Sequence, residues 1–294
     1  MLLFRAIPLN EVNLWALGGV GLVAGLLGSM LGVGGGILIV PILTLALHLP
    51  IKVAIASSLV AIVANSCTAA GMYTKARVTN IRLGLLLETT TTPGAIIGGF
   101  IAAVIAPSIL SALFGLVLIY AAYIMITRQH LMYDDTQPDS HIVQNNSTDN
   151  LSTSLASSYY DRNLDRVITY KVTRIPVGLG TSFFAGILSS LLGVGGGIVN
   201  VPVMHLVMGV PMKVAIATSA FIITITATAG ALIYYYYGHI YPFIIAPLTI
   251  GVVIGSRIGV ELTQRAGGIV LRRIFGALLI IVAAMMFFKI ADII

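Results

Sequence analysis

The chain has 294 residues, of which 58% are hydrophobic and only 9% are charged, and its mean hydropathy is +1.02. An ordinary soluble domain carries about 25% charged residues, so this composition excludes one. Several apolar runs can cross a bilayer, which takes about 20 helical residues, whereas the short alternating segments of a membrane β-barrel are missing. The net charge of +6 lies mostly in short loops, where the positive-inside bias explains it and an anion-attracting surface is the alternative. We therefore expect a polytopic helical membrane protein.

The first half of the chain begins with an apolar run over 14–31, followed by the sequence GVGGG and a short apolar run over 37–49. Pro50 and Lys52 begin a longer predicted span that reaches about residue 74. After a basic loop at 75–82, predicted spans over 83–105 and 109–127 complete a membrane unit at residues 1–127.

Residues 128–174 differ from the rest of the chain because they are rich in Asp, Asn, Ser and Thr. Such a segment cannot bury enough apolar surface to offset the entropy of ordering. We expect a flexible polar linker that contains a short helix near Leu164–Lys171.

The second membrane unit, at residues 175–294, repeats the plan of the first. An apolar run from Ile175 leads to a second GVGGG and a short run that ends at Val210, followed by predicted spans over 211–237, 243–263 and 270–288. Residues 25–58 and 186–219 are identical at 20 of 34 positions, with a constant offset of 161 residues. Self-similarity at a fixed offset is the signature of a duplicated unit.

The loop charges predict how the two halves are related. In the first half the loop at 75–82 is basic and the later loop at 106–108 is uncharged. In the second half the loop at 238–242 has no Lys or Arg, and the later loop at 264–273 is basic. Because positive charge marks cytoplasmic loops, matching loops lie on opposite sides and the halves form inverted-topology repeats. The linker is then cytoplasmic and both termini lie outside.

The short run after each GVGGG leaves two arrangements open. Residues 37–49 are too few for a comfortable full span, which favours a re-entrant pair of helices joined by the glycines. A full crossing gives the same topology. Each half then contains this Gly-broken pair and three spanning helices. Eight plain spans in a parallel repeat are the alternative, and the loop charges do not favour it.

The glycines of each GVGGG should break the helix, because each costs about 1 kcal/mol of helix propensity. The short runs that begin near Gly36 and Gly197 then present helix N-termini, whose free N–H groups and partial positive charge form an anion site. We predict a central cradle formed by the backbones of Gly34, Gly35, Gly36, Gly195, Gly196 and Gly197. The alternative is close helix packing, which is the interpretation we prefer for Gly25, Gly94, Gly98, Gly255 and Gly259.

A polar stripe follows each Pro-x-Lys element. Its members are Ser57, Ser58 and Asn65 in the first half and Thr218, Ser219 and Thr226 at the matching positions of the second. Residues seven apart share one face of a helix, so each stripe can line a solute path or form hydrogen bonds between helices. Asn200, where the first copy has Ile39, is a further candidate for solute binding.

Three charged residues are candidates for transport roles. Lys52 and Lys213 occupy matching positions, and the inverted topology puts them at opposite mouths of the path, although snorkelling to the interface explains them equally well. Glu88 lies inside a predicted span, where a carboxylate is a candidate for proton coupling unless it pairs with an arginine such as Arg82. The sequence has no metal-ligand, nucleotide-binding or nucleophile–base motif, so we expect no cofactor, no nucleic-acid partner and no enzymatic activity.

The GVGGG-x4-P segment, the P-x-K-x-A-x-A-[ST]-S element and the later pairs of glycines spaced by four together resemble the TauE/SafE sulfite-exporter-like family of permeases. The resemblance covers about 14–127 and 175–288, but not the linker. It implies a multi-pass transporter in the inner membrane of a bacterium or archaeon. The solutes it implies are small sulfur-containing anions, sulfite or organosulfonates such as sulfoacetate, and the direction of transport stays open.

From the sequence we therefore expect an ion-coupled secondary transporter whose partners are the anion and the lipid bilayer. A passive anion channel and a membrane-embedded protein that binds a partner protein are the alternatives.

Overall fold

The computed structural model describes residues 14–127, 155, 157–161 and 166–265, which are almost entirely helical. The first half forms α1 (Leu14–Leu31), α2 (Gly36–Leu45), α3 (Ile51–Lys75), α4 (Ile81–Val104) and α5 (Pro107–Thr127). The second half forms α7 (Ile175–Leu192), α8 (Gly197–Pro202) with its π-helical continuation η3 (Val203–Val207), α9 (Met212–Tyr236) and α10 (Pro242–Arg265). The predicted span over 270–288 lies outside the described residues.

Six of these helices have the length and hydropathy of membrane spans, namely α1, α3, α4, α7, α9 and α10. Their outer faces carry large exposed apolar side chains, such as Phe100, Leu232 and Ile250. Exposed apolar surface on this scale suits a hydrocarbon environment, and it would be a liability in water. The prediction of an all-α polytopic membrane protein is confirmed.

The helices of the two halves match in position and length. α1 and α7 begin at residues 14 and 175, α3 and α9 at 51 and 212, and α4 and α10 at 81 and 242. Each pair is therefore separated by the same 161 residues as the repeated sequence. The duplication extends over the four-helix unit and is not limited to the glycine motif.

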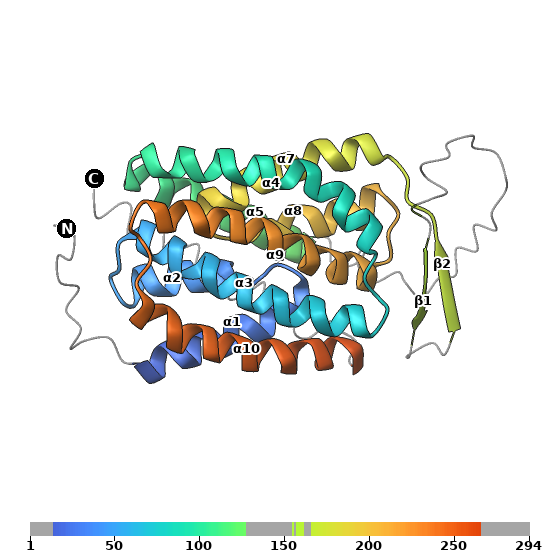
Figure 1. The fold of residues 1–294 in the computed structure, drawn as a ribbon, viewed down its shortest axis with the longest axis horizontal. Helices are drawn as coiled ribbons and strands as arrows, with labels where there is room; N and C mark the ends of the chain where they lie inside the picture. The colour runs from blue at the N-terminus through green and yellow to red at the C-terminus, as the bar shows by residue number, and fades with distance from the viewer. Residues whose placement is uncertain (1–13, 128–154, 156, 162–165, 266–294) are drawn as a thin grey trace.

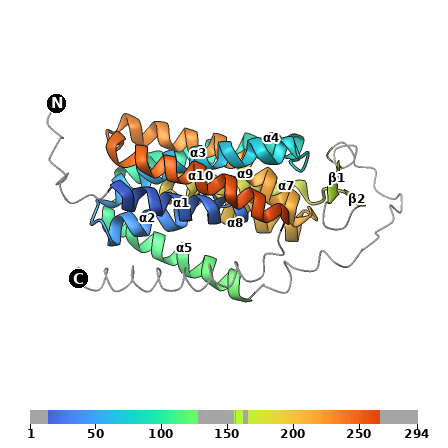
Figure 2. The same cartoon turned by 90° about the horizontal axis from the view of Figure 1, so that it is seen from below.

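The two halves interlock in the bundle (Figures 1 and 2). α1 packs along α10 and α4 packs along α7, while α3 and α9 contact each other between these pairs. In Figure 1 α3 runs toward the end of the bundle that carries the strands, and α9 runs away from it. The first helix of each half therefore packs against a helix of the other half, which places both glycine motifs in the interior.

Glycines allow the paired helices to approach closely. A Cβ atom on Gly25 would lie 2.3 Å from the carbonyl oxygen of Val252, and one on Gly255 would lie 2.0 Å from that of Leu22. A Cβ atom would likewise lie 2.2–2.3 Å from a carbonyl oxygen of the neighbouring helix if it were placed on Gly94, Gly98 or Gly259. No side chain fits at such distances, so the packing interpretation of these five glycines is confirmed.

Part of the linker forms a β-hairpin. β1 (Ser157–Asp161) pairs with β2 (Arg166–Tyr170) at the end of the bundle where α3 ends (Figure 1). Tyr159 and Tyr170 are buried, and Nδ2 of Asn80 donates to the Tyr170 hydroxyl over 3.1 Å. The prediction of a short helix near Leu164–Lys171 is wrong, because residues 166–170 are largely β-branched and aromatic and favour a strand. Residues 128–154 of the linker lie outside the described residues.

Candidate functional site

Both GVGGG segments break the helix. α1 ends at Leu31 and α2 begins at Gly36, and α7 and α8 are separated in the same way. The φ angles are +67°, +90° and +87° at Gly32, Gly34 and Gly35, and +67°, +92° and +66° at Gly193, Gly195 and Gly196. Residues with a Cβ atom rarely adopt this left-handed conformation, so both breaks require glycine at these positions.

The two breaks contact each other. A Cβ atom on Gly36 would lie 2.0 Å from the carbonyl oxygen of Gly193, and one on Gly197 would lie 2.1 Å from that of Gly32. These two carbonyls are also held across the halves by hydroxyl groups, because Ser58 Oγ donates to Gly193 and Ser219 Oγ donates to Gly32, each over 2.8 Å. Ser58 and Ser219 are therefore the residues that fix each break against the helix of the other half.

Each break exposes backbone donors at the start of a helix. None of the hydrogen bonds between described residues uses the N–H groups of Gly35, Gly36 and Ile37 at the first break, or of Gly195, Gly196 and Ile198 at the second. The first N–H groups of a helix have no partner within it, and they carry the positive end of its dipole. Such a group of donors can accept an anion.

Buried polar side chains without a partner surround the breaks. Asn65 lies against the first break. A Cβ atom placed on Gly28 would be 2.7 Å from Asn65 Nδ2 and 2.4 Å from the backbone nitrogen of Gly35, so both groups border the same point. Ser189 lies against the second break, with its Cβ 3.4 Å from a Cβ placed on Gly196. Asn65 Oδ1, Ser189 Oγ and Asn200 Nδ2 are buried and unpartnered, although Asn200 Oδ1 accepts from Ser182 Oγ over 3.2 Å. Buried polar atoms are almost always bonded, so a cluster of free ones marks a place that can receive a solute or water.

Glu88 is buried in α4, with an exposed fraction of 7%. The Thr226 hydroxyl in α9 lies 3.0 Å from Oε1 and 3.2 Å from Oε2, and the Thr92 hydroxyl also donates to Oε1. The carboxyl group is therefore held by hydroxyls of α4 and α9, and Thr226 links it to the polar stripe predicted from the sequence.

The remaining members of the stripe differ in their surroundings. Ser57 is buried and its hydroxyl has no partner. The Thr218 hydroxyl accepts from the backbone N–H of Asn80 over 3.1 Å, which ties the start of α4 to α9. Solute contact by these residues stays a prediction.

Lys52 and Lys213 lie in the first turns of α3 and α9, at opposite ends of the bundle (Figure 1). Lys52 Nζ donates to the carbonyl oxygen of Ala103 over 2.8 Å, so it caps the C-terminus of α4 and complements its dipole. Burial, together with the charge of Lys52, lowers the pKa of His239 in the loop after α9. At this end of the bundle burial and Lys52 therefore both disfavour the charged form of His239.

Comparison with known proteins shows the family of the chain. The family described as Sulfite exporter TauE/SafE matches residues 17–286. The chain belongs to this family. The chain is 28% identical over 252 residues to "Probable membrane transporter protein YunE" of Bacillus subtilis (strain 168), covering 83% of this chain and 86% of that protein. It is also 28% identical over 261 residues to "Probable membrane transporter protein MJ0441" of Methanocaldococcus jannaschii, covering 84% of this chain and 85% of that protein. No solved structure matches.

The family and these relatives are membrane transporters, so this TauE/SafE chain is a membrane transporter and not an enzyme. The sequence analysis did not identify three polar residues of the candidate site, namely Thr92, Ser182 and Ser189. Ser189 had a detectable signal, because it stands where the first copy of the repeat has Gly28. Thr92 and Ser182 had none, since only the packing of α4, α7 and α8 reveals their partners.

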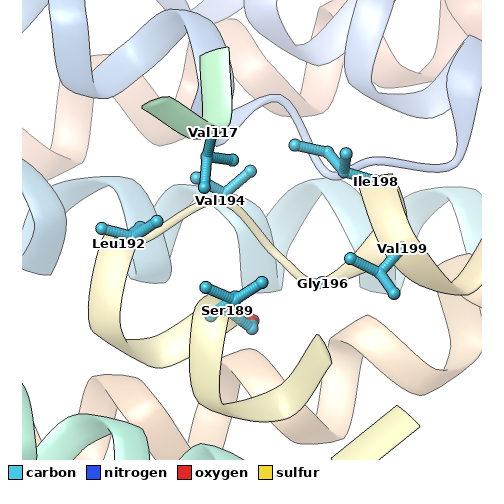
Figure 3. Close-up of a pocket in the computed structure, with 8 residues that line it drawn as sticks. Val117, Ser189, Leu192, Val194, Gly196, Ile198 and Val199 are labelled. Carbon is cyan, nitrogen blue, oxygen red and sulfur yellow. The ribbon is translucent and has the colours of Figure 1, made fainter. Parts of the chain in front are cut away.

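A small cavity of about 40 Å³ lies beside the second break of the TauE/SafE chain (Figure 3). Its walls come from α5, α7, the break and α8, and consist of Val117, Leu188, Ser189, Leu192, Val194, Gly196, Ile198 and Val199. The atoms that face the cavity are apolar. Because a bare charge is costly in apolar surroundings, we do not assign this cavity to an anion. The cavity is a small unfilled apolar space next to the second break.

Proposed function

We propose that this chain is a secondary transporter that moves a small sulfur-containing anion, sulfite or an organosulfonate, coupled to a proton. The observation that carries the proposal is the contact between the two glycine breaks, where N-terminal N–H groups lie beside buried polar atoms without partners. The solute class follows the description of the family. The breaks add the chemistry that such an anion requires, namely hydrogen-bond donors and the positive ends of helices.

The two halves are arranged as inverted repeats in this proposal. The opposite directions of α3 and α9 in Figure 1 support it, since these helices are equivalent members of the duplication. α2 has 10 residues and a length of about 15 Å, half of a hydrocarbon core of about 30 Å, which supports a re-entrant pair. The basic loop at 75–82 lies at the end of the bundle that carries the hairpin, so this end and the linker face the cytoplasm. Both termini then lie on the other, non-cytoplasmic side of the inner membrane.

The anion binds where the breaks meet, between the backbones of Gly34–Gly36 and Gly195–Gly197. Sulfite and sulfonate groups present three oxygen acceptors, and the free N–H groups and the amides of Asn65 and Asn200 supply donors around them. Ser57, Thr218 and Thr226 line the path to this point. Ser58 and Ser219 act by holding the breaks in place, because their hydroxyls already donate to backbone carbonyls. Lys52 and Lys213 stand at the two mouths of the path.

Glu88 carries the coupled proton. An intramembrane carboxyl group is rarely retained without a function. Its contact with Thr226 supports the assignment, because Thr226 stands in α9 at the position that Asn65 occupies beside the first break. Protonation of the carboxyl and occupation of the anion site can therefore influence each other through one hydroxyl group.

Uptake into proteoliposomes tests the proposal. The purified protein is reconstituted, and the entry of radioactive sulfite is measured with and without an inward proton gradient, with ethanesulfonate and sulfoacetate as competitors. We expect saturable uptake that the gradient stimulates and at least one organosulfonate inhibits. A flux that neither saturates nor responds to the gradient would indicate a passive anion channel. No flux, together with no stabilisation by any anion tested, would favour a protein that binds a macromolecular partner.

A further inference from the structure

Two buried tyrosines occupy equivalent positions near the ends of α3 and α9. Tyr73 and Tyr234 are separated by the 161 residues of the repeat, and their exposed fractions are 3% and 2%. Their surroundings differ. The Tyr73 hydroxyl donates to the carbonyl oxygen of Ser29 over 3.1 Å and lies near the Thr263 side chain, whereas the Tyr234 hydroxyl has no partner.

The contact of Tyr73 is part of a chain of three hydrogen bonds that closes into a ring through the backbone of α3. Ser29 in turn donates from Oγ to the carbonyl oxygen of Ser256 over 3.2 Å, and Ser256 Oγ donates to the carbonyl oxygen of Asn65 over 3.1 Å. The ring begins and ends on α3 and passes through α1 and α10. It therefore ties three helices together between the first glycine break and the end of the bundle that carries the basic loop.

The second half lacks this ring. The residue equivalent to Ser29 is Ser190, which is fully buried and whose hydroxyl has no partner. The positions equivalent to Ser256 and Thr263 are Ala95 and Ala102, which have no hydroxyl. A buried hydroxyl without a partner is unfavourable, so Tyr234 and Ser190 are both expected to find partners in another state of the protein.

We propose that the ring of Tyr73, Ser29, Ser256 and Asn65 is a latch that closes one side of the central site, and that Tyr234 and Ser190 form its open counterpart on the other side. The inference rests on the central site of the proposed function. During transport the Tyr73 hydroxyl leaves the Ser29 carbonyl as that side opens, and the Tyr234 hydroxyl reaches Ser190 as the other side closes. Because the alanines leave the second latch weaker, the resting protein favours the state that is closed toward the basic loop.

The latch is tested by the accessibility of a cysteine beneath it. Ser66 is suitable because it is buried and lies seven residues before Tyr73, on the same face of α3. The parent protein carries Cys67→Ser and Ser66→Cys, is reconstituted in full length, and is treated with a membrane-impermeant maleimide on the side of the basic loop. Tyr73→Phe removes only the hydroxyl and should raise the labelling rate about fivefold, the population shift that corresponds to one lost hydrogen bond.

The matched control is Tyr234→Phe, which should not raise the labelling rate, because its hydroxyl has no partner to lose in the closed state and supports only the state that is open toward the basic loop. Ser256→Ala breaks the same ring without touching either tyrosine and should raise labelling as Tyr73→Phe does. Equal labelling of the parent and Tyr73→Phe, or equal effects of the two tyrosine variants, would overturn the latch. Labelling requires no solute, so a failure to transport sulfite would count against the proposed function and leave the latch standing.

Discussion

The two glycine breaks have the same backbone and different polar neighbours. In both copies three glycines adopt the left-handed conformation, a serine of the other half holds a carbonyl, and the following helix begins at the fifth residue of the motif. The first break is flanked by Gly28 and Ile39, whereas the second is flanked by Ser189 and Asn200. The shared features give both breaks the same backbone conformation, and the side chains that differ give each break its own polar surroundings.

The two halves also differ at equivalent positions farther from the glycines. Glu88 has Thr249 as its counterpart, and Thr226 has Asn65. The first half therefore carries both the carboxyl group and the amide, and its carboxyl group contacts the stripe of the second half. In the proposed function the anion and the proton occupy two different sites, and a duplicated fold can provide them by changing side chains on one scaffold.

The largest loss of stability is expected from substitutions at Gly36 or Gly197, where the two breaks contact each other. Alanine at either position would place its Cβ within 2.1 Å of a carbonyl oxygen of the opposite break, so we expect a loss of roughly 3 kcal/mol of stability in both variants. Gly71→Ala is the control, because nothing lies within 4 Å of its Cβ and alanine favours the helix. Thermal unfolding in detergent measures all three, and a large loss in one of the two variants alone would contradict the equivalence of the breaks.

Glu88→Gln tests whether the halves differ in proton coupling. With one proton per anion, a gradient of one pH unit supports about tenfold accumulation. We expect the variant to lose this accumulation and to retain exchange of solute without a gradient, because glutamine still accepts from Thr226 but cannot carry the proton. Thr249→Val, at the equivalent position, should accumulate solute normally. Gradient-driven accumulation by Glu88→Gln at the wild-type level would exclude Glu88 as the coupling group.

Ser58→Ala and Ser219→Ala sharpen the comparison, because their hydroxyls make equivalent hydrogen bonds of equal length. Each substitution should cost about 1 kcal/mol of stability, and the two costs should be equal. Thr89→Ala removes an exposed hydroxyl that bonds only to its own helix, and it should cost less than either. Stability curves for the three variants check this, and two clearly unequal serine effects would mean that one break is held by other contacts.

The smallest effect is expected at the end of the bundle where Lys52 meets His239. Since the pKa of His239 is lowered in the folded protein, the unfolded chain binds this proton more readily and stability falls on acidification. The loss begins as the pH falls through 6.5, the ordinary value for histidine, and is complete below the lowered pKa. Lys52→Gln removes the repulsion and should make the melting temperature less sensitive to pH in this range. An unchanged pH profile would show that Lys52 does not act on His239.

The sequence predicted most of the scaffold and less of the site. Span boundaries and the breaks follow from hydropathy and from glycines, because both depend on local properties of the chain. The hydroxyl of Ser58 could be placed on the inner face of its helix, but its acceptor in the other half depends on how α3 packs against the second break. The hairpin was missed for the same reason, since its Tyr159 and Tyr170 are buried against the rest of the structure, and a polar linker gives no local sign of such a surface.

The central claim is that an anion is bound where the breaks meet, with the polar side chains of the second break as donors. The most direct test compares the melting temperature of the wild-type protein with that of Asn200→Ile, which copies the residue of the first break, in sulfite, ethanesulfonate, sulfoacetate and chloride. A ligand of the folded state must stabilise it. We predict that a sulfur oxyanion raises the wild-type melting temperature well above chloride and that Asn200→Ile loses most of this shift. No shift with any sulfur anion, or the same shift in both proteins, would contradict the account.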